Sequence, residues 1–320
     1  MELIAGDIGG TKSGLAWVKS EGTDTQEVRF EQVYASADFA TADDLVRQFI
    51  VDARQPAAAD TLLLALPGPL RGQHARLTNL EWTLDAADMQ ASLGVARVRF
   101  INDFQAAAAG VASLTAADVV ALNPQPVEAG GVRAITGAGT GLGVAFMLAG
   151  AEGRIRSFPS EGGHIDFAPA NATQDRLLEH LRARYGHVSW ERVVSGSAMN
   201  DLYRFCCGEL GRPLLAEPLD GAVLGVRAET GDAAAAAALD LFIDLYGAWV
   251  GNVALLYQPR GGLYVAGGVA LHLRSRMRSP RFMAAASDKG RMRGVVEGTP
   301  IFLVTQQRLG LLGAIATALA

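Results

Sequence analysis

The sequence predicts an α/β protein built from two related halves, and three observations support this prediction. Short apolar runs with the length of buried strands occupy residues 61–66, 98–101, 263–266 and 301–305. Stretches with the apolar spacing of helices, such as residues 40–54 and 175–185, alternate with these runs. A glycine-rich turn of one pattern occurs twice. The alternation is typical of α/β proteins, and the repeated turn indicates a duplication.

The two glycine turns lie between apolar runs that resemble strands. Residues 3–5 lead into the first turn at residues 6–11, and the second turn lies within residues 134–148. The two segments match at a single offset of 129 (139 − 10). At that offset Gly10, Thr11, Gly14, Leu15, Ala16 and Trp17 match Gly139, Thr140, Gly143, Val144, Ala145 and Phe146. We therefore expect two homologous halves.

The chemistry of these turns suits phosphate binding. Glycines lack a Cβ atom, so that backbone N–H groups can approach a phosphate, and threonine hydroxyls add further donors. Neither turn has the ending of a P-loop or the G-x-G-x-x-G spacing of a dinucleotide-binding fold. A pair of tight β-turns is the simpler alternative. The repetition favours two hairpins that grip one polyphosphate from two sides.

The composition is that of a compact enzyme. Of the 320 residues, 50% are hydrophobic and 19% are charged, which argues against a disordered chain. The formal net charge of -5 argues against a large nucleic-acid-binding surface. Cys206 and Cys207 are adjacent and provide neither a disulfide framework nor a zinc site. Since we find no basic leader and no run of roughly 18 uncharged apolar residues, we expect a cytoplasmic protein without a nucleic-acid or membrane partner.

Two segments of the second half have distinctive patterns. Residues 232–257 carry apolar side chains at helical spacing and predict a long core helix. Gly267 and Gly268 follow the strand-like run at residues 263–266. Glycines at that place suit the close backbone approach of a ligand. A plain strand with glycine turns would have the same pattern.

Asn102 and Asp103 directly follow the strand-like run at residues 98–101, where α/β folds place ligands. An aspartate at that place can act as a base. Alternatively, the pair caps a helix over residues 106–112, since Asn and Asp are both common N-caps. The residues alone leave both interpretations open.

A second polar set consists of acids and a histidine. Glu161, His164 and Asp166 lie on a glycine turn, and Glu191 follows later in the chain. Carboxylates accept hydrogen bonds from sugar hydroxyls, and imidazole can donate or accept one. A site of this kind rejects analogues that lack the hydroxyl. Metal ligation is the alternative, but no second nearby histidine or cysteine completes a ligand set.

Eight motifs in chain order resemble the bacterial glucokinase family, and the match spans nearly the whole chain. They are residues 6–11, 78–82, 101–104, 137–143, 161–169, 191–196, 266–268 and 310–314. Related kinases of the repressor-kinase group carry a cysteine-rich zinc motif after their equivalent of His164, and this sequence has none. The chain therefore looks like the zinc-free branch of the actin-like sugar kinases. Ser160 departs from the family pattern, which has glycine there.

The resemblance implies the actin-like, duplicated ribonuclease-H-like sugar kinase fold, in which two α/β domains close on an interdomain cleft. It places a small α/β domain at residues 1–113 plus 304–320, so that the C-terminal helix returns to the first domain, and a large α/β domain at residues 114–303. Such enzymes phosphorylate the 6-hydroxyl of D-glucose with ATP and Mg²⁺. The expected partners are glucose and ATP, and a homodimer is compatible with the family.

The resemblance also implies roles for single residues. Asp103 would be the catalytic base on the 6-hydroxyl, and Asp7 would hold Mg²⁺, directly or through water. The residues that would bind the sugar are Asn102, Asp103, Glu161, His164 and Glu191. The residues that would hold ATP are Asp7, Gly9, Gly10, Thr11, Gly139, Thr140 and Gly141 at the phosphates, and Gly267 and Gly268 beside the adenosine.

Two other functions are compatible with the same fold. One is a kinase of another hexose or of an N-acetylhexosamine. The other is a non-catalytic sugar-sensing regulator, which needs a DNA-binding helix-turn-helix. We expect no such element, because the first strand-like run already begins at residue 3.

Overall fold

The structure is a computed structural model that describes residues 1–320 except 22–25, 78–79, 151–154, 215–218 and 220. The predicted motif at residues 78–82 therefore lies partly outside the described residues. The chain divides into two compact units. The first comprises Met1–Thr115, Glu152–Pro159 and Arg308–Ala320, and the second comprises Ala116–Ala151 and Ser160–Gln307.

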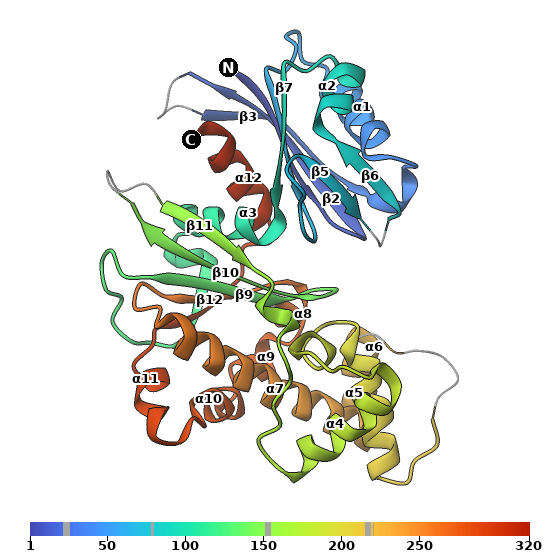
Figure 1. Ribbon diagram of the computed structural model, residues 1–320, viewed down its shortest axis with the longest axis vertical. Helices are drawn as coiled ribbons and strands as arrows, with labels where there is room; N and C mark the ends of the chain where they lie inside the picture. Colours follow the sequence, from blue (N-terminus) through green and yellow to red (C-terminus); the bar gives the residue numbers. More distant parts are fainter. Residues whose placement is uncertain (22–25, 78–79, 151–154, 215–218, 220) are drawn as a thin grey trace. The chain divides into compact units, whose positions relative to one another are not determined.

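The first unit is a five-stranded sheet with helices on both faces (Figure 1). Its elements are β1 (Glu2–Ile8), β2 (Lys12–Ser20), β3 (Gln26–Ala35), α1 (Ala42–Ala53), β4 (Thr61–Leu66), β5 (His74–Leu77), β6 (Trp82–Asp85), α2 (Ala86–Leu93), β7 (Arg97–Asn102), α3 (Asp103–Gly110) and α12 (Leu309–Leu319). The strand order is β3-β2-β1-β4-β7. β1, β2 and β3 pair antiparallel, whereas β1, β4 and β7 are parallel.

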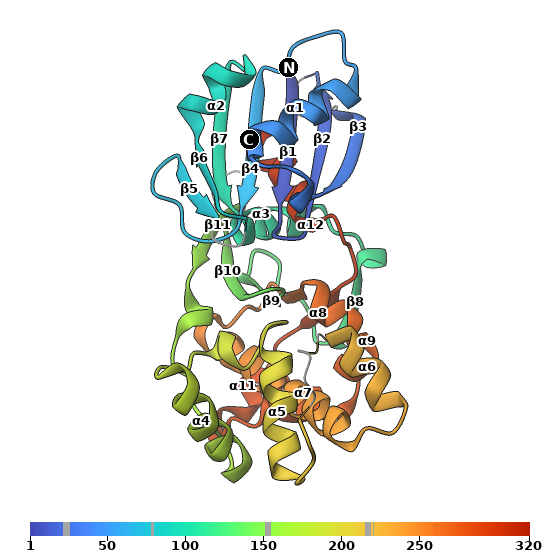
Figure 2. The same ribbon diagram turned by 90° about the vertical axis from the view of Figure 1, so that its right-hand side faces the viewer.

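Alternating side chains of these strands build two separate cores. Ile4, Leu62 and Leu64 point to the face that α1 and α2 cover, whereas Leu3 and Leu63 belong to the core with α3 and α12. Figure 2 shows α1 in front of this sheet. Every residue of β4 is buried, because the strand is central and covered on both faces.

The C-terminal helix α12 packs in the first unit, as the resemblance implied. It meets α3 backbone to backbone. A Cβ atom at Gly313 would collide with the carbonyl oxygen of Ala106, and one at Gly110 would collide with that of Leu309. Glycine at both places therefore permits the close contact.

The second unit also has a sheet, with more helices around it (Figure 1). It contains the consecutive strands β10-β9-β12-β13-β8. The elements from residue 116 onward are β8 (Val119–Asn123), β9 (Arg133–Ala138), β10 (Leu142–Ala149), β11 (Ile155–Ser160), α4 (Ala172–Tyr185), α5 (Ala198–Glu209), α6 (Gly221–Glu229), α7 (Ala233–Tyr257), β12 (Leu263–Ala266), α8 (Gly268–His272), α9 (Arg274–Met277), α10 (Pro280–Ser287), α11 (Arg293–Glu297) and β13 (Ile301–Val304). Single 3₁₀ turns at Gly162–His164 and Trp190–Arg192 join them.

The long helix α7 forms the centre of the second core, as its apolar pattern predicted. Asp232 caps it by accepting hydrogen bonds from two backbone N–H groups at 3.0 and 3.1 Å. Tyr246 and Trp249 are fully buried, and each hydrogen-bonds to β9, at Ala138 N and Thr136 Oγ1. The helix thus fixes the strand that leads into the second glycine turn.

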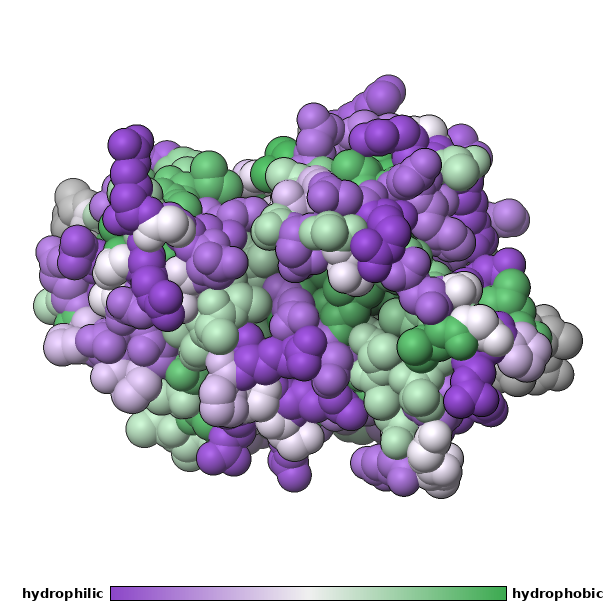
Figure 3. All heavy atoms as spheres, turned by 90° about the horizontal axis from the view of Figure 1, so that it is seen from below, coloured by the Kyte–Doolittle hydropathy of each residue, from purple (hydrophilic) through white to green (hydrophobic). Residues whose placement is uncertain are grey.

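Among the described residues, α7 is also the one helix long and apolar enough to cross a membrane. Of its most apolar window, 72% is buried inside the structure. The apolar character is therefore that of a core helix. Figure 3 shows hydrophilic residues over most of one face of the molecule, with apolar residues between them.

The registers of the two glycine hairpins show how far the repeat holds. Ile8 pairs with Ser13 in the first hairpin, and Ala138 pairs with Leu142 in the second. The offset is therefore 130 (138 − 8) before the turn and 129 (142 − 13) after it. The strands after the turns match as the sequence predicted. The second turn, however, is one residue shorter.

The shortening changes which glycines correspond. The N–H of Gly9 donates to the carbonyl of Lys12 at 3.0 Å, and the N–H of Gly139 donates to that of Gly141 at 2.9 Å. These equivalent bonds place Gly139 in the position of Gly9. The sequence match of Gly139 with Gly10 was wrong, because Gly10 has no counterpart in the shorter turn.

The same registers identify the counterparts of two acids. Asp7 in β1 corresponds to Gly137 in β9 (137 − 7 = 130). Across the parallel strands, the register places Ile101 of β7 at the position of Val304 of β13. Two residues further on, Asp103 therefore corresponds to Gln306. Both acids are therefore present in the first unit and replaced in the second.

Candidate active site

Two groups of the predicted residues lie at one edge of the first unit. Asp7 is near the carboxyl end of β1, and Asn102 and Asp103 follow the carboxyl end of β7. β4 alone separates β1 from β7. Two strand spacings correspond to ~10 Å. The first unit thus brings these three side chains to the same edge of its sheet.

The first glycine turn is held by Ser36, which follows β3. The Ser36 Oγ donates to the carbonyl of Gly9 at 2.7 Å, and its backbone N–H donates to the carbonyl of Thr11 at 3.0 Å. The buried hydroxyl of Ser13 lies 2.9 Å from the Ser36 Oγ. Carbonyl oxygens that would repel a phosphate are therefore engaged by the protein, and the turn suits an anion.

Asp7 is enclosed by the first turn of α12. A Cβ atom at Gly310 would collide with the Asp7 carboxylate, so glycine is required there for the acid to fit. Burial raises the pKa of Asp7 from 3.8 to about 6. The carboxylate is still mainly ionised at neutral pH and remains an oxygen donor of the kind that Mg²⁺ prefers.

The helix after β7 begins at Asp103, earlier than the predicted residues 106–112. Its N-cap is Asn102, whose Oδ1 accepts from the N–H of Gln105 at 3.1 Å and whose Nδ2 donates to the carbonyl of Gly68 at 3.2 Å. Asp103 is the first helical residue, and its Oδ1 accepts from the N–H of Phe104 at 2.8 Å. Since Asn102 supplies the cap, Asp103 is not needed for that role.

The second unit brings together the other acids and the histidine. The Nε2 of His164 lies 4.0 Å from Glu161 Oε2, and its Nδ1 lies 3.9 Å from Glu191 Oε1. The side chains of Glu161 and His164 are 65% and 58% exposed, and that of Glu191 is 28% exposed. These separations exceed hydrogen-bond length, so the three groups can each accept or donate a bond to a ligand.

Two further predicted features concern this histidine loop. Asp166 does not pair with His164. Its Oδ1 is hydrogen-bonded to the Nε2 of His187, at 2.6 Å. Across the described ranges, no group of three or more His, Cys, Asp or Glu residues is placed to hold a metal ion. The Oγ of Ser160 accepts from the N–H of Gly162 at 3.1 Å, so the residue that departs from the family pattern stabilises the loop.

The second glycine turn is held by a segment that follows Glu191. The N–H of Gly196 donates to the carbonyl of Gly139 at 2.8 Å, and the Oγ of Ser197 donates to the carbonyl of Thr140 at 3.2 Å. As in the first unit, a backbone N–H and a serine hydroxyl engage the carbonyl oxygens of the turn. The resemblance between the turns therefore extends to the residues that hold them.

Gly267 and Gly268 lie where β12 ends and α8 begins. Gly267 has a φ of +100°, a conformation that favours glycine, and a Cβ atom there would lie 2.6 Å from the carbonyl oxygen of Ala138. Gly268 faces open space. Gly267 is therefore required by the fold, whereas the space at Gly268 is free for a ligand.

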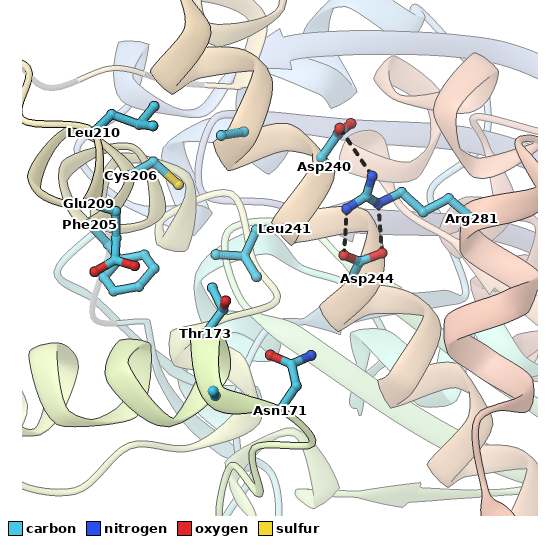
Figure 4. A pocket seen from close by; sticks show the side chains of 12 residues that line it. Asn171, Thr173, Phe205, Cys206, Glu209, Leu210, Asp240, Leu241, Asp244 and Arg281 are labelled. Atoms are coloured by element: carbon cyan, nitrogen blue, oxygen red, sulfur yellow. Dashed lines mark hydrogen bonds and ion pairs between the residues drawn. The ribbon is translucent and has the colours of Figure 1, made fainter.

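A hollow of about 560 Å³ lies elsewhere in the second unit, among α4, α5, α7 and α10 (Figure 4). None of the predicted site residues lines it. Arg281 lies between Asp240 and Asp244 there, and Glu209 pairs with Arg176. Because each of these charges is paired within the protein, the hollow specifies no ligand.

The sequence predicted none of the contacts that hold the candidate site in place. Ser36, Ser197 and Gly310 contact the two turns or Asp7 from distant parts of the chain. Gly310 and the pair Ser195-Gly196 do belong to two of the eight motifs, which marked these segments but not their contacts.

Comparison with known proteins gives one family over nearly the whole chain. The family model described as Glucokinase matches residues 4–320. A glucokinase of Synechocystis sp. is 37% identical over 99% of this chain and 98% of its own. Among solved structures, a glucokinase from an Antarctic psychrotroph has a TM-score of 0.83 and 30% identity, covering 99% of this chain and 98% of its own. The glucokinase of Balamuthia mandrillaris, solved in complex with glucose, has a TM-score of 0.80 and 25% identity, covering 100% and 94%.

The family match extends over both units and all the strands that carry the predicted site. Each of the two similar sheets contains an antiparallel hairpin with a glycine turn. These sheets are those of the two-domain actin-like fold. With an identity above 30% over nearly the full length of its relatives, this chain belongs to the glucokinase family.

Proposed function

We propose that this chain transfers the γ-phosphoryl group of ATP to the 6-hydroxyl of D-glucose, giving glucose 6-phosphate and ADP. The observation that carries the proposal is the position of Asp103 at the carboxyl end of β7, beside an asparagine that already caps the helix. Its carboxylate serves as the base that receives the hydroxyl proton. Phosphoryl transfer needs little else from protein beyond positioning and charge stabilisation.

The phosphates of ATP are the proposed ligands of the two glycine turns. In the first turn Gly10 and Thr11 offer N–H groups and a hydroxyl, and in the second turn Thr140 and Gly141 do so. The N–H groups of Gly9 and Gly139 are bonded within the turns, so these two glycines would shape the turns around the phosphates. The engaged carbonyl oxygens of both turns support this role. Gly267 and Gly268 would border the adenosine.

Asp7 is the residue that would hold Mg²⁺, directly or through water. The donor set fits the ion, because a carboxylate oxygen is its preferred ligand. When bound, Mg²⁺ neutralises the developing charge on the phosphates. Asp7 itself contributes a negative charge at the edge of the sheet, where Gly310 leaves room for it.

The sugar would be held by Asn102 and Asp103 of the first unit and by Glu161, His164 and Glu191 of the second. Asn102 has one N–H bonded to Gly68, which leaves the second for a hydroxyl. Since these atoms lie 3.9 and 4.0 Å apart around His164, a sugar hydroxyl that lies beside two of them can reach both at hydrogen-bond length. The proposal also includes a small domain at residues 1–113 plus 304–320 and a large domain at residues 114–303. The enzyme would act in glycolysis in the cytoplasm. It would form a homodimer and bind neither nucleic acid nor a membrane.

A coupled assay of ADP formation tests this function. Purified protein is supplied with ATP and Mg²⁺ and with a panel of glucose, mannose, fructose and N-acetylglucosamine. We expect turnover with glucose to exceed that with every other sugar. A higher kcat/KM with another hexose or an N-acetylhexosamine would reassign the substrate, and glucose binding without turnover would indicate a sensor.

A further inference from the structure

A single segment of the second unit bonds to Gly139 and Thr140 of the second glycine turn and to Leu142, which follows it. We call residues 191–197 the strap. Besides the bonds from Gly196 and Ser197 to the carbonyls of the turn, the Oε2 of Glu191 accepts a hydrogen bond from the N–H of Leu142 at 2.9 Å. The turn is therefore held at its start, its middle and its end.

The carboxylate of Glu191 also fills the space over Gly141. A Cβ atom at Gly141 would collide with the Oε2 of Glu191. The other oxygen, Oε1, is the one that faces His164 at 3.9 Å. One carboxylate thus has an oxygen on the phosphate turn and an oxygen on the side of the sugar-binding residues.

The rest of the strap is internally rigid. The buried hydroxyl of Ser195 donates to the carbonyl of Glu191 at 2.8 Å, lies 2.9 Å from the Ser197 Oγ and accepts from the N–H of Ala198 at 3.2 Å. The hydroxyl of Ser195 therefore links the backbone of Glu191 to the side chain of Ser197. The whole connection lies within the second unit.

We propose that the strap couples glucose binding to triphosphate binding, with Ser197 as a positioning residue for the phosphate turn. The proposal rests on the function proposed above. A sugar hydroxyl bonded to Oε1 fixes the carboxylate, and the fixed Oε2 then orders the N–H of Leu142 and the turn beside it. By linkage, a nucleotide that orders the turn must strengthen glucose binding by the same factor.

The first experiment compares two alanine substitutions in one turn. Neither Gly139 nor Gly141 has a positive φ, so both backbones accept alanine. The new methyl group in Gly141→Ala displaces Glu191, whereas in Gly139→Ala it meets no atom within 4 Å. By calorimetry without nucleotide, we expect Gly141→Ala to weaken glucose binding about tenfold and Gly139→Ala to change it less than about twofold. Equal glucose affinity in the two variants would overturn the proposal.

The second experiment measures the coupling itself. In the unaltered protein, a nonhydrolysable ATP analogue with Mg²⁺ should lower the glucose Kd by about fivefold or more. Ser197→Ala should leave the glucose Kd without nucleotide unchanged, raise the KM for ATP about 3- to 10-fold and bring the coupling factor close to one. Ser197→Thr, which keeps the hydroxyl, should restore it.

Ser279→Ala is the matched control, because its Oγ also donates to a backbone carbonyl of the second unit, that of Arg276 at 2.6 Å. It should leave the coupling factor unchanged. An unaltered factor in Ser197→Ala, or a factor of one in the active unaltered protein, would refute the strap's role. Failure of the proposed function is distinct from both, since it would abolish glucose-dependent ADP formation in the unaltered protein.

Discussion

The two units share a frame and differ in what it carries. In each, a hairpin pairs antiparallel and then continues into two parallel strands, as β2-β1-β4-β7 and as β10-β9-β12-β13. In each, a serine hydroxyl and a backbone N–H hold the turn. The first unit has Asp7 and Asp103 where the second has Gly137 and Gln306. A duplicated sheet thus supplies two glycine turns, whereas the two acids proposed for the reaction are present in one unit only.

The acids proposed to bind the sugar lie outside the frame that the two units share. In the first unit α1 alone lies between β3 and β4 as a full helix, whereas α4 to α7 lie between β11 and β12. Glu161 and His164 lie at the 3₁₀ turn that begins this larger insertion, and Glu191 lies in the 3₁₀ turn that follows α4. In the proposed function, the insertion would therefore supply the hydroxyl recognition that the shared frame lacks.

The largest effect is expected at Asp103. Asp103→Asn keeps the size of the side chain but cannot take a proton, so kcat should fall by about 10² to 10⁴. Glucose binding by calorimetry and the unfolding temperature should survive, because Asn102 provides the cap. Gln306→Ala is the matched change in the second unit and should lower kcat by less than about threefold. A similar loss in both variants would break the comparison, and retained turnover in Asp103→Asn would exclude the base.

Asp7→Asn should weaken the enzyme while stabilising the fold. Loss of the carboxylate should raise the Mg²⁺ concentration needed for half-maximal activity by about 10- to 100-fold. A rise of the pKa from 3.8 to about 6 corresponds to about 3 kcal/mol of ionisation cost, so without Mg²⁺ the variant should be more stable at pH 7. An unchanged dependence of activity on Mg²⁺ concentration would exclude Asp7 as a Mg²⁺-binding residue.

The stability gain of Asp7→Asn should also depend on pH. Between about pH 4 and pH 6 the folded protein keeps the Asp7 proton that the unfolded chain releases, so native stability falls as pH rises through this window. The difference in unfolding temperature between variant and unaltered protein should therefore be near zero at pH 4 and largest above pH 6. A difference independent of pH would contradict the buried, ionised carboxylate.

Glu191→Gln tests the acid that the second unit adds. The amide oxygen can still accept from Leu142 N–H, but the negative charge is lost on the side of the sugar. We expect the KM for glucose to rise about tenfold or more, with a smaller change in kcat than in Asp103→Asn. The measurement is the coupled assay at saturating ATP. An unchanged KM would exclude Glu191 from the sugar site.

The smallest effect is expected from zinc removal. Burial raises the pKa of Cys206 to about 12, so this thiol stays protonated and is a poor metal ligand. A zinc-selective chelator should leave the Mg²⁺-supported activity unchanged. Loss of activity that added zinc restores would contradict the prediction.

Local patterns predicted the elements well where burial dictates composition. The strands Thr61–Leu66 and Leu263–Ala266 have the predicted bounds, because fully covered parallel strands read as continuous apolar runs. The core helix α7 follows from its spacing in the same way. The helix after Asp103 began earlier than predicted, because the cap at Asn102 decides where it starts.

Positions that depend on contacts across the chain could not be predicted from the sequence. Matching residue types along the sequence aligned Gly139 with Gly10. The hydrogen bond from its N–H across the turn places Gly139 at the position of Gly9 instead. The need for glycine at 310 is visible only once α12 lies over Asp7. The acids and turns of the candidate site were each predicted singly, whereas the serines that hold the turns were not.

The packing of α12 against the N-terminal sheet affects when this unit can fold during synthesis. Leu311, Ala314 and Ile315 complete a core whose other members include Leu3 and Ala5. The three residues of α12 leave the ribosome only after the whole of the second unit has emerged. We therefore expect the N-terminal sheet to remain without one of its covers during synthesis, so that the unit translated first is the last to reach its native state.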